Sequence, residues 1–157
     1  MGSYKNDKDI NRRKFLEDQI DEKYLKIDKL INQRKAELIA DLVSKNITTS
    51  YTDNIGASKT GSFTNSTENM NLTFSSDKVI LELEKYRQSF IDLIELLNDE
   101  DKKIFYLRWG ENTRYDWSEI YYILKNSDTG YNYSHTKQLY RRRDFILDRL
   151  AELLNII

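Results

Sequence analysis

Apolar residues recur every three, four or seven positions over most of the chain, and this spacing limits what the chain can fold into. In the first long segment, residues 7–46, the recurring residues are Leu16, Ile20, Tyr24, Ile27, Ile31, Leu38 and Leu42. The spacing places them along one side of an α-helix, whereas a half-buried strand would show strict alternation. The sequence also contains no proline, the residue that most strongly interrupts a helix. We therefore predict an all-α fold.

The apolar stripe of residues 7–46 is narrow, and Arg34 interrupts it between Ile31 and Leu38. A long helix with so narrow a stripe is not stable alone and needs a partner helix. The partner is either a second copy, in a coiled-coil-like homodimer, or another long helix of the same chain.

The composition changes abruptly over residues 47–76, where serine, threonine, asparagine and glycine dominate. This composition predicts a flexible connector. Alternating residues at 70–74 are compatible with a short strand. A second long helix is predicted over 77–97, with a Ser or Asp cap and apolar residues on one side. We expect 7–97 to form a helical hairpin or coiled-coil oligomerisation region with 47–76 as its flexible insert.

Residues 98–157 predict three helices, which we interpret as a helix-turn-helix DNA-binding domain. Asn98 and Asp99 offer cap oxygens for the first helix, and Gly110 suits its end. The second helix is predicted to start near Asp116, and the third after Ser134, a suitable N-cap. The last helix has an apolar side and a polar side. Its apolar side contains Leu139, Ile146, Leu150, Leu153 and Ile157.

The polar side of the last helix has the residue types that a DNA-reading helix needs. Its first turns must offer donors to base edges, and nearby cations must neutralise phosphates. The candidate DNA-binding residues are His135, Thr136, Lys137, Gln138, Tyr140, Arg141 and Arg142. A run of arginines on a helix is also common on an ordinary solvated surface, so this pattern alone does not decide the function.

Three short motifs add a resemblance. They are Leu107-Arg108-Trp109, Trp117-Ser-Glu-Ile120 and Tyr131-Asn-Tyr-Ser134, followed by the basic helix. This arrangement resembles the sigma-factor region-4-like domain of phage and prophage transcriptional regulators of Gram-positive bacteria, of the ArpU and RinA type. The resemblance covers about residues 104–147 in sequence and most of the chain in layout. It departs from the family at residues 125–133, which are longer than the usual turn.

The resemblance implies a sequence-specific transcriptional regulator of phage or mobile-element type. Double-stranded DNA would be its partner, and RNA polymerase a candidate second partner. The formal net charge of −1 is low for a nucleic-acid binder, so we expect modest, salt-sensitive affinity per monomer. This favours a homodimer, or a partner protein that supplies the remaining affinity. The absence of cysteine, of an apolar span and of a signal sequence favours the cytoplasm of a bacterial host and argues against a membrane partner.

Catalysis has little support in the sequence. His135 is the single histidine, and there is no cysteine and no phosphate-binding glycine-rich loop. We expect no enzyme activity, no cofactor and no metal site. Two alternatives stay open: a DNA-packaging subunit of the small terminase type, and a protein-interaction or inhibitor module that does not bind DNA.

Overall fold

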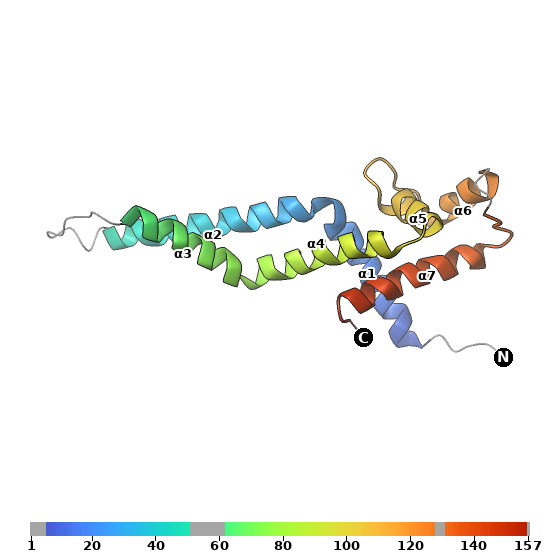
Figure 1. The fold of residues 1–157 in the computed structure, drawn as a ribbon, viewed down its shortest axis with the longest axis horizontal. Coiled ribbons are helices and arrows are strands. Elements are labelled where there is room, and N and C mark those ends of the chain that lie inside the picture. The colour runs from blue at the N-terminus through green and yellow to red at the C-terminus, as the bar shows by residue number, and fades with distance from the viewer. Residues whose placement is uncertain (1–5, 51–61, 128–130, 157) are drawn as a thin grey trace. The chain divides into compact units, whose positions relative to one another are not determined.

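The computed structural model describes residues 6–50, 62–127 and 131–156, with side chains except at 46–50 and 62–66. Within these residues every regular element is helical, as Figure 1 shows, which confirms the all-α prediction. The elements are α1 (Asp7–Lys23), a 3₁₀ turn (Tyr24–Lys26), α2 (Ile27–Ser50), α3 (Ser62–Ser76), α4 (Lys78–Leu96), α5 (Asp99–Trp109), α6 (Trp117–Asn126) and α7 (Thr136–Leu153).

The chain divides into two compact units, and the division differs from the predicted domains 7–97 and 98–157. One unit, called here the α7 unit, combines residues 1–26 with 86–157, and the other, the α2 unit, spans residues 27–85. The predicted first helix is interrupted by the 3₁₀ turn, and its N-terminal part, α1, belongs with α7. The physical reason is long-range pairing, because α1 arginines bind aspartates of α7.

The α2 unit contains the segment that the sequence predicted to be a connector. Residues 62–76 form α3, so the expected flexible insert 47–76 and the short strand at 70–74 are wrong for this part. Residues 51–61 of the insert lie outside the described residues. The α3 helix packs on α2, where the Lys35 ammonium lies 5.5 Å from the centre of the Phe74 ring. This packing stabilises a sequence of weak helix formers.

Arg34, the residue that interrupts the apolar stripe, has a definite role in the α2 unit. Its Nε and Nη2 donate to the two carboxylate oxygens of Asp77, at 3.1 and 2.9 Å. Asp77 Oδ2 also accepts from the backbone N–H of Ile80, at 3.0 Å, and so caps the start of α4. The ion pair lowers the pKa of Asp77. Arg34 thereby ties α2 to the cap of α4.

The α7 unit contains the larger core. Fully or almost fully buried side chains come from α1, the second half of α4, and α5 to α7. They include Leu16, Ile20, Phe90, Leu93, Ile104, Phe105, Trp109, Ile120, Leu124, Leu139, Ile146, Leu147 and Leu150. The rings of Tyr24 and Phe105 meet edge to face at 5.0 Å, which joins the 3₁₀ turn to α5. The predicted apolar side of α7 is confirmed for Leu139, Ile146 and Leu150.

Candidate nucleic-acid interface

Local capping determines where α5 and α6 begin, as the sequence predicted. Asn98 Oδ1 accepts from the N–H of Asp101 at 2.8 Å. Asp116 and Glu119 form a reciprocal capping box, with each side chain accepting from the other's backbone N–H at 2.8 Å. These bonds satisfy backbone donors that a helix start leaves without partners. The α5, α6 and α7 helices each contact the other two, so α7 is held against two supporting helices.

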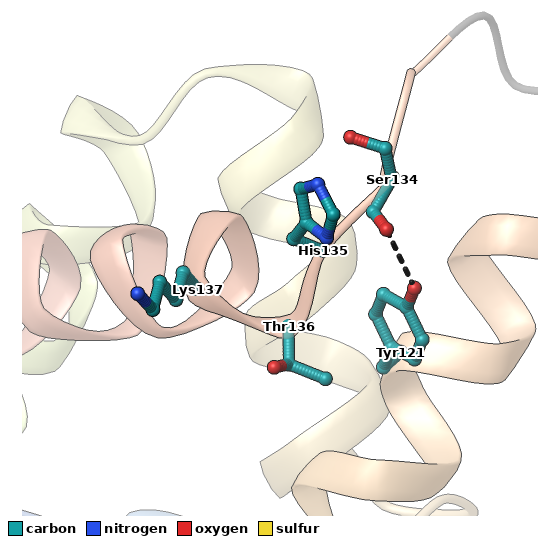
Figure 2. Close-up of a pocket in the computed structure, with 5 residues that line it drawn as sticks. All are labelled: Tyr121, Ser134, His135, Thr136 and Lys137. Carbon is teal, nitrogen blue, oxygen red and sulfur yellow. Dashed lines mark hydrogen bonds between the residues drawn. The ribbon is translucent and has the colours of Figure 1, made fainter.

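The α7 helix begins one residue later than predicted, because its N-cap is His135 and not Ser134. Gln138 stabilises this start, since its Oε1 accepts from the N–H of Ser134 at 3.0 Å and, more weakly, from that of His135 at 3.4 Å. Figure 2 shows the Tyr121 hydroxyl of α6 pointing at Ser134, where it donates to the carbonyl oxygen at 3.2 Å. These contacts determine where the chain enters the helix.

A shallow hollow of about 420 Å³ lies at this entry point. Tyr121, Ser134, His135, Thr136 and Lys137 line it, and Figure 2 draws these five residues. The side chains of His135, Thr136 and Lys137 are exposed. The start of α7 therefore presents polar side chains to solvent next to the buried Tyr121.

The predicted DNA-binding residues fall into two groups in the structure. His135, Thr136, Lys137 and Arg141 are exposed, and within the described residues neither the Lys137 ammonium nor the Arg141 guanidinium forms a hydrogen bond or ion pair. Gln138, Tyr140 and Arg142 are half-buried and contact other parts of the α7 unit. The exposed side of α7 therefore begins with Lys137 and Arg141, which lie one helical turn apart.

Arg142 points inward and forms an ion pair with a buried carboxylate. Its Nε and Nη2 donate to Oδ1 and Oδ2 of Asp101, at 2.7 and 2.5 Å. Asp101 has 0% exposure, and burial raises the pKa of its carboxyl against the opposing effect of Arg142. The hydrogen bonds to Asp101 in turn raise the pKa of Arg142. Two nitrogens of Arg142, a residue predicted to contact DNA, thus bind α5 within the protein.

A neighbouring contact holds the segment that leads into α7. The Tyr133 hydroxyl donates to Glu100 Oε1. Burial, together with this hydrogen bond, raises the pKa of Tyr133, so the phenol stays protonated as a donor. Glu100 and Asp101 are consecutive residues in the first turn of α5. The first turn of α5 therefore binds α7 at two places: Glu100 binds Tyr133, just before α7 begins, and Asp101 binds Arg142 in its second turn. The sequence did not reveal this role of α5.

Arg143 lies among aromatic rings at the junction of α1, α6 and α7. Its guanidinium carbon is 4.8 Å from the ring centre of Tyr140 and 5.9 Å from that of Trp117. Arg143 also pairs with its neighbour Asp144, at 2.8 Å. Trp117 donates from Nε1 to Glu17 Oε1 of α1, at 2.9 Å. Burial raises the pKa of Glu17, although Trp117 and the nearby arginines act in the opposite direction.

The α1 helix contacts the second half of α7 through ion pairs. Arg13 donates from Nε and Nη2 to the Asp148 carboxylate, at 2.9 and 2.7 Å, and Arg12 reaches the same carboxylate at 3.2 Å. Burial alone would raise the pKa of Asp148, but the two arginines lower it on balance. Arg12 and Arg13 of α1 therefore pair with Asp148 of α7, whereas Lys137 and Arg141 in the first turns of α7 are exposed.

The sequence matches one protein family. A family model described as "Protein of unknown function (DUF722)" matches residues 13–152. The chain belongs to the DUF722 family. The DUF722 match begins at Arg13 in α1 and ends in the last turn of α7, so it includes the Arg13–Asp148 pair, the whole α2 unit and most of the α7 unit. No curated protein and no solved structure matches the chain.

The described part of this DUF722 protein has neither a membrane-crossing helix nor a metal-binding cluster. No described helix is both long enough and apolar enough to cross a membrane. No cluster of three or more His, Cys, Asp or Glu side chains among the described residues is arranged to hold a metal ion.

Proposed function

We propose that this protein is a sequence-specific DNA-binding transcriptional regulator of phage or mobile-element type, related in mechanism to the ArpU and RinA regulators. In this proposal α5, α6 and α7 form a helix-turn-helix unit in which α7 is the recognition helix. The proposed partners are double-stranded DNA, a second copy of the chain and RNA polymerase. The proposed location is the bacterial cytoplasm, and the proposed activity is binding without catalysis.

The observation that carries the proposal is the division of α7 into a buried side and an exposed cationic start. Leu139, Ile146 and Leu150 are buried, whereas Lys137 and Arg141 are exposed on the opposite side. A recognition helix needs this division, because it must pack on its supports while its first turns enter the major groove. His135 and Thr136 add exposed polar groups at the helix start.

The ion pairs revise which residues we propose to contact DNA. Arg141 is proposed as a phosphate contact and Lys137 as a base or phosphate contact. His135, Thr136 and Gln138 lie at the N-terminus of α7, which is the end proposed to enter the DNA groove. Arg142 and Tyr140 are proposed as positioning residues, because their side chains pack within the α7 unit.

The test is fluorescence anisotropy of labelled DNA from around the protein's own gene, across a salt series. Each lost phosphate contact should reduce the slope of log K against log salt by about one. Arg141→Ala should show this reduction, and Arg142→Ala should lower affinity without changing the slope. Lys78→Ala removes an exposed cation from α4 as the matched control and should change neither quantity.

A second candidate function is a protein-interaction module, and one observation favours it. Phe145 lies one turn after Arg141 on the same exposed side of α7, and it is 41% exposed. The guanidinium carbons of Arg142 and Arg149 lie 5.3 and 5.4 Å from its ring centre. Aromatic and arginine side chains are enriched at the energetic centres of protein interfaces. If no DNA fragment binds at low salt, the DNA proposal fails, and a partner lost on Phe145→Ala would support this second function.

A further inference from the structure

One side of α2 has no charged residues along its middle. Ala36, Ile39, Ala40 and Val43 recur at helical spacing on this side, and we call these four residues the α2 seam. At 3.6 residues per turn, the charged residues between 34 and 45 fall on the remaining sides of the helix.

The α2 seam is exposed, and the described neighbours of α2 lie elsewhere. Ile39 is 37% exposed and Val43 is 48% exposed. The α3 helix packs on the side that contains Lys35, whose ammonium lies over the Phe74 ring. Arg34 also faces away from the seam, toward Asp77. Within the described residues of the α2 unit, the side chains of the seam residues form no hydrogen bond, ion pair or ring contact.

The α2 unit buries little apolar surface by itself. Among its described side chains, the buried hydrophobic ones are Ile27, Ile31, Ile80 and Leu83, and the large exposed ones are Ile39, Val43, Leu72, Val79 and Leu81. A helical unit with so few buried apolar side chains gains stability when a further helix covers its exposed apolar residues. The spacing of the seam is that of helix-to-helix packing, so the expected occupant is a helix.

We propose that the α2 seam pairs with the same seam of a second copy of this chain. A face without charges meets its own copy without like-charge repulsion, and the net charge of −1 adds no long-range repulsion between copies. Ala36 and Ala40 are small enough to let two helices approach closely, while Ile39 and Val43 fill the interface. The contact is then a two-fold one in which both copies use the same patch. This contact rests on the second copy that the proposed function includes and names its surface, but it does not depend on what α7 binds.

The first experiment is sedimentation velocity on the full chain over a range of concentrations. The expected result is a monomer–dimer equilibrium that Ile39→Glu with Val43→Glu shifts to monomer. Leu72→Glu with Val79→Glu is the matched control, because it places the same charges on exposed apolar positions of the α2 unit outside the seam. Circular dichroism establishes that each variant is folded. A monomer at all concentrations, or a dimer that survives the seam change, overturns the proposal.

The absence of cysteine from the sequence provides a second, direct measurement. A single Ala40→Cys variant should form an intermolecular disulfide under mild oxidation, because the same residue of the other copy lies across the seam. Asp41→Cys is the control, since this exposed neighbour points to another side of α2. Equal cross-linking at both positions contradicts the proposal. Anisotropy on a single DNA half-site, measured on the monomeric seam variant, tests α7 separately from the seam.

Discussion

Asp101 and Arg142 form a bidentate ion pair that joins the first turn of α5 to the second turn of α7. The carboxylate is fully buried, while the side chain of Arg142 retains 33% of its exposure. The pair therefore orients the helix that we propose reads DNA, and it does so from the inside of the α7 unit. The neighbouring Arg141 is exposed, so two adjacent arginines have different roles.

Removing Arg142 should destabilise the protein far more than removing Arg141. Arg142→Ala leaves the buried Asp101 carboxylate without its partner, which typically costs about 3–5 kcal/mol. Arg141→Ala removes an exposed side chain and should stay within about 0.5 kcal/mol. Urea unfolding followed by circular dichroism measures both values. Equal stabilities for the two variants would show that the ion pair contributes nothing to the fold.

Glu17→Gln should raise the melting temperature at pH 7. Glutamine keeps an acceptor for Trp117 Nε1 but removes a charge that burial disfavours. Because the folded pKa of Glu17 is raised, the wild type gains stability as pH falls through that pKa. The difference between the two proteins should therefore close by about pH 4.3, the unfolded value for glutamate.

Thermal melts across this pH range measure the effect, and Glu17→Ala is the control for the lost hydrogen bond. A Glu17→Gln variant that is less stable than wild type at pH 7 would show that attraction to Arg143 and Arg108 outweighs the cost of burial.

The start and end of α5 and α6 could be predicted because their signals are local. Asn98 and Asp116 are caps that act on backbone groups three residues away. Local signals could not predict that the Arg142 side chain points into the protein, because its partner Asp101 lies 41 residues earlier on another helix. A signal was nevertheless present, because Arg142 is three residues after Leu139 and four before Ile146, both buried.

The grouping of α1 with α7 and the helix α3 were missed for two different reasons. Arg13 and Asp148 are 135 residues apart, and helical spacing carries no information about such a pair. The α3 sequence is rich in serine, threonine and asparagine, whose side chains compete with the helix backbone. Packing on α2 outweighs that weak local preference.

Tyr133→Phe should destabilise the protein by about 1.5–3 kcal/mol, the usual value for a hydrogen bond to a charged group. Tyr133 is buried, and its hydroxyl donates to Glu100. Phenylalanine keeps the ring and removes only this bond. Tyr131→Phe is the control, because Tyr131 is less buried and the same atom is removed. Chemical unfolding of both variants measures the difference, and a similar loss at both positions would contradict the assigned role.

Gly110→Ala should destabilise the protein although the backbone at this position suits any residue. Gly110 has φ −69° and ψ 162°, so its glycine is not explained by a left-handed conformation. A Cβ there would instead lie 2.3 Å from the carbonyl oxygen of Tyr106 and 2.9 Å from Thr113 Oγ1. The oxygen accepts from the N–H of Gly110 at 2.8 Å, so relief of the clash requires the end of α5 to move.

The expected cost of Gly110→Ala is about 1–3 kcal/mol, as for overpacked sites. It should exceed the gain of about 0.4–1 kcal/mol that alanine brings by restricting the unfolded chain. Glu111→Ala, at the exposed next residue, is the control and should be nearly neutral. Thermal melts of the two variants measure the contrast. A Gly110→Ala variant as stable as Glu111→Ala would mean that the chain leaves α5 by a different path, with Tyr106 and Gly110 farther apart.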